Sequence, residues 1–128
     1  MQVVNLIAEV LKKEGIKYLS AFPTTPVIEG VARAGLRPII CRQERVGVGI
    51  ADGYSRVTNG MPPGVFAMQY GPGAENAFAG VATAYSDAVP MLFLPLGHPI
   101  ERDGIFPHFN SVKSFESVTK HSEYVTGA

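Results

Sequence analysis

Three short polar segments each follow an apolar run that is typical of a buried strand. Residues 23–25 (Pro-Thr-Thr) follow the first run, residues 42–44 (Arg-Gln-Glu) the second, and residues 69–73 (Gln-Tyr-Gly-Pro-Gly) the third. In parallel sheets, ligands gather where the carboxyl ends of the strands meet. We therefore expect these three segments to converge on one edge of a sheet and to form the functional part of the chain.

Glu44 is the acidic residue in these segments, at a point where a strand is predicted to turn into a helix. Its position at the predicted sheet edge makes it a candidate functional group. The simpler interpretation is a carboxylate that is favourable in the first turn of a helix, flanked by solvated Arg42 and Arg45. Composition by itself favours the simpler interpretation.

The glycines at 71 and 73 allow close approach to the backbone just before a predicted helix, and such a loop can meet an anion. The segment lacks the third glycine of the dinucleotide fingerprint, so it is weak evidence for a nucleotide. Asn76, in the first turn of that helix, has the simpler interpretation of an ordinary polar residue.

Other reactive residue types have structural interpretations. Cys41 ends an apolar run, which favours a buried thiol. Asp52 and Asp87 are interpreted as surface or capping groups. The three histidines, His98, His108 and His121, do not have the spacing of metal ligands. No metal site is therefore expected.

Helical and strand patterns alternate along the chain. Residues 3, 6, 7, 10 and 11 form an apolar stripe at helical spacing, and Gly15 is a natural stop. Residues 90–96 are almost wholly apolar, as expected for a strand buried on both faces. A last short strand is possible within 118–126, after a loop over 98–110. The sequence predicts helices over 3–14, 26–34, 44–58 and 74–87, and strands over 16–22, 37–41, 64–68 and 90–96.

This alternation predicts an α/β fold, a three-layer α/β/α arrangement with a mostly parallel sheet. The 128 residues correspond to one domain, and 46% of them are hydrophobic. A net charge of zero with no basic run argues against nucleic-acid binding. No apolar stretch reaches the roughly 18–20 residues that span a membrane. The N-terminus does not have the pattern of a secretory signal, and a single cysteine fits a cytoplasmic setting.

Taken together and in order, several segments resemble the pyrimidine-binding (N-terminal) domain of thiamine-diphosphate enzymes, with the acetolactate synthase and 2-oxo-acid decarboxylase group as the nearest. The resemblance extends from about Val4 to Val125. The segments that carry it are RQE at 42–44, ADGYSR at 51–56, GPGAEN at 71–76, GVATAY at 80–85, and Pro90.

The resemblance implies roles for four residues. Glu44 would be the catalytic glutamate, which hydrogen-bonds N1′ of the cofactor's aminopyrimidine and so promotes activation of the thiazolium C2. Pro23, Pro72 and Asn76 would line the cofactor pocket. The implied activity is decarboxylation and carboligation of 2-oxo acids such as pyruvate, with thiamine diphosphate as cofactor. The cofactor would supply the electron sink and the protein the geometry.

The chain departs from the family pattern at several points. Thr24 and Thr25 stand where the acetolactate synthase group often has glycines. The family's glutamine after the last apolar strand has no clear counterpart, so we carry no role over to the candidates Pro107, His108 and Asn110. The Gly-Asp-Gly motif that holds magnesium and the diphosphate is absent, because it belongs to a second, pyrophosphate-binding domain.

The resemblance therefore implies a domain over 1–128 that is incomplete at its C-terminal end and inactive alone. It would be part of a longer multidomain enzyme, or the alpha-type subunit of a split 2-oxo-acid decarboxylase. A different interpretation is a non-catalytic domain that only dimerises or binds a nucleotide.

The expected partners are a pyrophosphate-binding domain, on the same or another chain, and further copies in a dimer or tetramer. The helix 74–87 is either an ordinary buried core helix or a pairing face that comprises Ala77, Phe78, Val81, Ala82 and Tyr85. Whether flavin is bound is left open.

Overall fold

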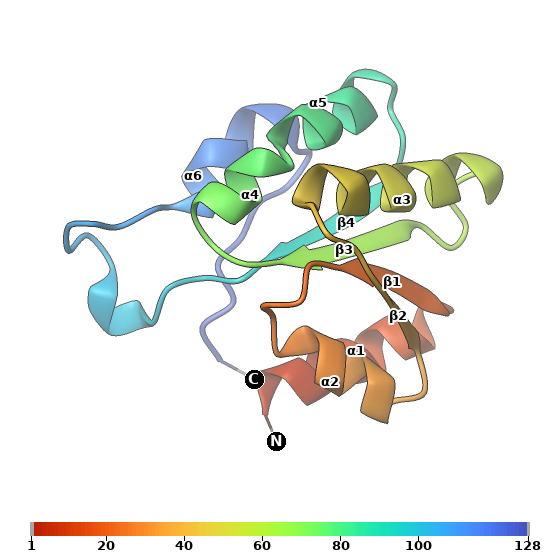
Figure 1. The fold of residues 1–128 in the computed structure, drawn as a ribbon, viewed down its shortest axis with the longest axis horizontal. Coiled ribbons are helices and arrows are strands. Elements are labelled where there is room, and N and C mark those ends of the chain that lie inside the picture. The colour runs from red at the N-terminus through yellow and green to blue at the C-terminus, as the bar shows by residue number, and fades with distance from the viewer. Residues whose placement is uncertain (1, 128) are drawn as a thin grey trace.

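The computed structural model describes residues 2–127 and contains a four-stranded sheet in which every neighbouring pair of strands is parallel (Figure 1). Helices lie on both faces of the sheet, and each crossover between strands carries at least one helix. This confirms the predicted three-layer α/β fold. The strands are, in their order across the sheet, β2 (Arg37–Ile40), β1 (Tyr18–Ala21), β3 (Gly64–Met68) and β4 (Met91–Pro95).

Two helices, α1 (Val3–Lys13) and α2 (Val27–Arg33), cover the lower face of the sheet in Figure 1. The upper face carries α3 (Glu44–Val57), α4 (Pro72–Asn76), α5 (Phe78–Ser86) and α6 (Ser111–Phe115). Two short 3₁₀ helices, η1 (Ile100–Arg102) and η2 (Glu116–Val118), lie in the C-terminal part of the chain.

The core is divided by the sheet into two clusters, one under each helical layer. The fully buried strand β3 contributes to both, because successive side chains of a strand point to opposite faces. Val65 and Ala67 pack with α1 and α2, whereas Phe66 and Met68 pack with α3 and α5. The central strand therefore ties the two layers together.

The glycines that are predicted to end helices do end them. Gly15 follows α1 with a φ of 80°, and Gly35 follows α2 with a φ of 89°. The predicted helix over 74–87 differs, since it begins earlier, at Pro72, and is divided at Ala77. The Ala77 N–H donates to the Ala74 carbonyl at 3.0 Å, a tightened turn that interrupts the α-helical pattern.

Two predictions for the C-terminal part are wrong. Strand β4 is not buried on both faces, because it lies at the end of the sheet order and Leu92 is 39% exposed. No strand forms within 118–126. Side chains rather than a backbone ladder hold that segment, as Ser122 Oγ donates to the Val112 carbonyl and the Tyr124 hydroxyl to the His98 carbonyl.

Within the described residues, none of the helices combines the length and the apolar character needed to cross a membrane.

Candidate functional site

The position of α3 is set by close contact with the sheet. A Cβ added at Gly47 would lie 2.1 Å from Phe66 Cε2 and 2.7 Å from Cys41 Sγ, so only glycine fits. The Ser20 hydroxyl, buried on β1, donates to the Gly47 carbonyl at 2.7 Å. These contacts fix the first turn of α3 and with it Glu44, the first residue of the helix.

Glu44 is a buried carboxylate, 5% exposed, beside the carboxyl ends of the strands. Its Oε2 accepts a 2.6 Å hydrogen bond from Asn76 Nδ2. The other end of the same amide, Asn76 Oδ1, accepts from Arg45 Nε at 3.3 Å and Nη2 at 3.1 Å. The amide therefore holds the carboxylate on one side and a guanidinium on the other, a satisfied arrangement for a buried charge.

The loop before α4 brings Asn76 to Glu44. Gly71 has φ 62° and ψ −129°, a backbone conformation that side chains strongly disfavour. Pro72 follows at the start of α4, where its fixed φ suits the helix and its missing N–H costs nothing. A Cβ at Gly73 would lie 2.2 Å from Gln69 Cγ, so the turn packs tightly on its own entry segment.

The structure thus brings two of the four predicted site residues, Glu44 and Asn76, into direct contact. Pro72 is on the same short helix as Asn76 and is exposed. Pro23, also exposed, lies in the loop after β1, a neighbour of β3 in the sheet. In that loop Thr25 is buried and its Oγ1 accepts from the Val27 N–H at 3.3 Å, which helps α2 to begin.

The structural interpretations hold for Cys41 and Asp87, whereas Asp52 is neither a surface nor a capping group, because it lies in the middle of α3 with its Oδ1 buried. Cys41 is buried and its Sγ donates to the Ala21 carbonyl; burial raises the pKa of this thiol, which opposes a nucleophilic role. Asp52 and Asp87 both pair with Arg56, at 2.8 and 2.7 Å, and these carboxylates raise the pKa of the guanidinium. Arg45 is exposed, as expected, and its guanidinium also donates to Asn76 Oδ1. Its position next to Glu44 was the signal available in the sequence.

The proposed pairing face on helix 74–87 is corrected by its burial. Ala77 and Val81 belong to the core cluster under α3, and Phe78 packs on Phe115 with ring centroids 5.3 Å apart. Only Tyr85 of that set is largely exposed, at 54%. The five residues therefore do not form one outward face, since most of them are needed inside.

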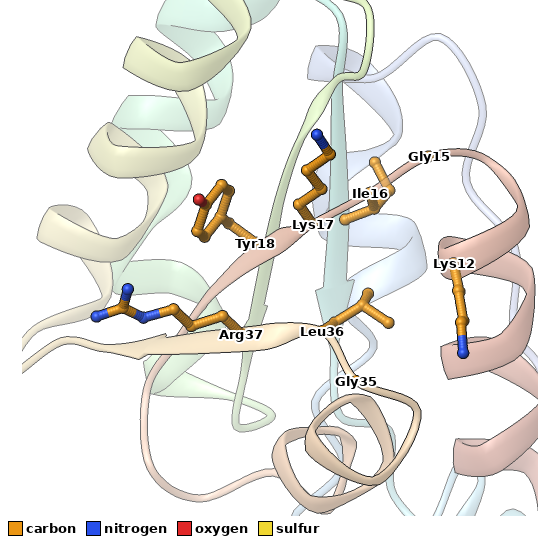
Figure 2. Close-up of a pocket in the computed structure, with 8 residues that line it drawn as sticks. All are labelled: Lys12, Gly15, Ile16, Lys17, Tyr18, Gly35, Leu36 and Arg37. Carbon is orange, nitrogen blue, oxygen red and sulfur yellow. The ribbon is translucent and has the colours of Figure 1, made fainter.

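A hollow of about 480 Å³ lies at the opposite, amino edge of the sheet and is not part of this site (Figure 2). Lys12, Lys17 and Arg37 line it, yet their side chains point in different directions. Of these, Lys12 lies in the last turn of α1, where the helix dipole favours a cation. Among the described residues, no group of three or more His, Cys, Asp or Glu side chains has the geometry to hold a metal ion.

Replacing Asn76 with alanine is expected to destabilise the chain by about 1–3 kcal/mol, because the buried Glu44 carboxylate loses its amide donor. Asn5→Ala is the matched control: Asn5 also accepts from an arginine, Arg33 at 3.2 Å, and within residues 2–127 its side chain has no hydrogen bond to a buried acid. We expect it to change stability by less than about 0.5 kcal/mol. Urea unfolding of both variants measures the difference. Equal losses would mean that the contact between Asn76 and Glu44 contributes no stability.

Comparison with known proteins gives consistent matches. The family model "Thiamine pyrophosphate enzyme, N-terminal TPP binding domain" matches residues 1–123. An acetolactate synthase large subunit of Haemophilus influenzae is 34% identical over 94 residues, which cover 70% of this chain and 16% of that protein. A probable acetolactate synthase large subunit of Methanocaldococcus jannaschii is 30% identical over 127 residues, which cover 95% of this chain and 21% of that protein. The chloroplastic acetolactate synthase 2 of Nicotiana tabacum is 32% identical over 127 residues, which cover 94% of this chain and 19% of that protein. The chain thus spans about a fifth of the length of these relatives.

Proposed function

Because the chain belongs to the thiamine pyrophosphate enzymes, as their N-terminal TPP-binding domain, we propose that Glu44 and Asn76 form the site for the aminopyrimidine of thiamine diphosphate. One observation carries this proposal. Glu44 is a buried carboxylate at the carboxyl edge of the sheet, and an amide from the neighbouring loop fixes its orientation. An acid that only favours a helix start would not need to be 5% exposed.

The Glu44 carboxylate and the Asn76 amide suit an aminopyrimidine ring. In this proposal Glu44 shares a proton with N1′ of the ring, while the Asn76 amide keeps the carboxylate from rotating away. Pro72 and Pro23 supply rigid apolar surface beside the ring. The cofactor supplies, when bound, an electron sink that makes decarboxylation of a 2-oxo acid possible. The residues of this chain position the cofactor and transfer one proton.

A second domain is needed in this proposal, since these residues hold only one end of the cofactor. That domain would bind the diphosphate together with Mg²⁺, and it would lie on the same chain or on a separate subunit. We further propose an acetolactate-synthase-like activity on pyruvate, with the alpha-type subunit of a split 2-oxo-acid decarboxylase as the second candidate. Similarity to three acetolactate synthases supports the first. A non-catalytic domain is disfavoured, because it would have no use for a buried carboxylate oriented in this way.

The decisive assay combines this domain with its pyrophosphate-binding domain, here called the assembled enzyme. We expect pyruvate consumption and acetolactate formation that require both thiamine diphosphate and Mg²⁺, and no turnover by the 128-residue chain alone. Decarboxylation without acetolactate would favour the decarboxylase. Failure of the assembled enzyme to exchange the C2 hydrogen of the cofactor for deuterium would refute the proposal.

A further inference from the structure

Arg45 is an exposed arginine that has no part in the proposed cofactor contacts, although it directly follows Glu44 on α3. Its guanidinium donates to Asn76 Oδ1 through two nitrogens, Nε at 3.3 Å and Nη2 at 3.1 Å. Within residues 2–127 it forms no ion pair, and the Asn76 amide is the group that holds it. Two consecutive side chains of α3 therefore bind opposite ends of one amide.

The stability of the helix does not explain this arginine. Arg45 is the second residue of α3, and a cation in the first turn opposes the helix dipole, which favours an anion there. Glu44, the first residue, already has the favourable charge. An arginine is also costly to order, because its long side chain loses rotamer freedom. The contact with Asn76 therefore accounts for Arg45 better than a role in helix stability does.

The amide of Asn76 has two possible orientations. An asparagine amide presents an acceptor at one end and donors at the other, and a half-turn of the side chain reverses them. In the observed orientation Nδ2 donates to Glu44 Oε2 at 2.6 Å. The reversed orientation would set Oδ1 against the carboxylate, and Nδ2 against the guanidinium of Arg45, which has donors only. Both neighbours oppose this reversal while Glu44 is ionised.

Protonation of Glu44 removes one of these two constraints. A protonated carboxyl group can donate as well as accept, so it can bond to either end of the amide. If Oδ1 turned toward it, the carboxyl proton would be bound by Asn76 instead of by N1′ of the cofactor. Arg45 still requires the oxygen on its own side, because its donors do not depend on the state of Glu44. Throughout the proton exchange of the proposed function, Arg45 is therefore the group that keeps the amide in place.

We propose that Arg45 is a positioning residue, which acts through Asn76 to keep Nδ2 directed at Glu44 in both protonation states of the carboxyl group. The inference rests on the proposed function, because it concerns proton exchange between Glu44 and N1′. It assigns Arg45 no contact with the cofactor or the substrate. The same contact links α3 to α4, two helices that pack together on the upper face of the sheet (Figure 1).

The test is Arg45→Met in the assembled enzyme, since methionine keeps an apolar side chain of similar reach and removes the donors. We expect cofactor C2 deuterium exchange at saturating thiamine diphosphate to fall about tenfold, because a displacement of about 1 Å at a reacting group can cost about 10²-fold. The cofactor concentration that gives half the maximal rate should not change, because the other domain holds the diphosphate. Urea unfolding should not change either, since Arg45 is exposed.

Arg33→Met is the matched control. Arg33 is also exposed and also donates to an asparagine, Asn5 Oδ1 at 3.2 Å, but it lies on α2, on the other face of the sheet. We expect it to leave C2 exchange unchanged. A second comparison is made in Asn76→Ala, where Arg45 has lost its acceptor. In that background Arg45→Met should cause no further loss, because the two residues act as one unit.

Exchange at the unmodified rate in Arg45→Met would overturn the inference and leave the proposed function standing. The same fractional loss in the Asn76→Ala background would also overturn it, because Arg45 would then act without the amide. A loss that saturating cofactor restores would indicate a binding role, and an equal loss in Arg33→Met a general effect of charge; either result would contradict the inference. Absence of C2 exchange in the unmodified enzyme would refute the proposed function and this inference together.

Discussion

In the assembled enzyme, Glu44→Gln is expected to lower the rate of cofactor C2 deuterium exchange by about 10²–10⁴-fold. The glutamine amide is close in size to the carboxylate and can still accept from Asn76, so the fold and most cofactor binding are retained. In the proposed role the glutamine cannot exchange a proton with N1′, so C2 activation is the step expected to be lost. Hydrogen–deuterium exchange at C2, measured together with pyruvate consumption, reports the effect.

Glu75→Gln is the matched control for this measurement. Glu75 is an acid in the first turn of α4, directly before Asn76, and it is exposed. If Glu44 only favoured the start of a helix, both variants would change stability by less than about 1 kcal/mol and would leave exchange alone. Exchange at the unmodified rate in Glu44→Gln would remove this residue from the proposed role and leave family membership intact.

Two glycines of α3 are expected to respond to alanine with opposite signs. Gly47→Ala places a methyl group against Phe66, which is fully buried, so the ring cannot yield and α3 must move away from the sheet. We expect a loss of about 1–3 kcal/mol or more. Gly49→Ala, two residues on, meets no atom within 4 Å and should stabilise the helix by about 0.5–1 kcal/mol.

Urea unfolding of the two variants, followed by circular dichroism, gives both free energies on one scale. Because the expected changes differ in sign within one helix, a general effect of helix propensity cannot produce them. Displacement of α3 would also withdraw Glu44 from Asn76, so Gly47→Ala is expected to lower C2 exchange in the assembled enzyme as well. Stabilisation by both alanines would show that α3 tolerates a larger separation from the sheet.

The alternation of strands and helices could be predicted because it depends on local periodicity and on glycine and proline residues that end helices and strands. Gly15 and Gly35 end helices for a reason that lies in their own backbone. The same local logic placed the segments around Glu44 and Gly71 after strands, and parallel pairing then required them to share an edge. The family resemblance added candidate roles for individual residues on that frame.

Local patterns could not decide how fully a strand is covered. The apolar run at β4 predicted burial on both faces, but burial depends on the position of the strand in the sheet order, where β4 comes last. The same holds for α5, whose apolar positions suggested a pairing surface. Ala77 and Val81 lie in the core, because α3 packs against that side of the helix.

The element types, their parallel arrangement and the edge that carries the candidate site could be predicted from the sequence, because these follow from interactions within a few residues and from the handedness of crossovers. Two sets of contacts could not be predicted in this way: Asn76 bonds to both Glu44 and Arg45, and the rings of His98 and His108 lie side by side. Glu44 and Asn76 are 32 residues apart, and Gly47 packs closely against Phe66 in the same helix that begins with Glu44. Side-chain contacts of this kind arise from packing between elements, which no local pattern encodes.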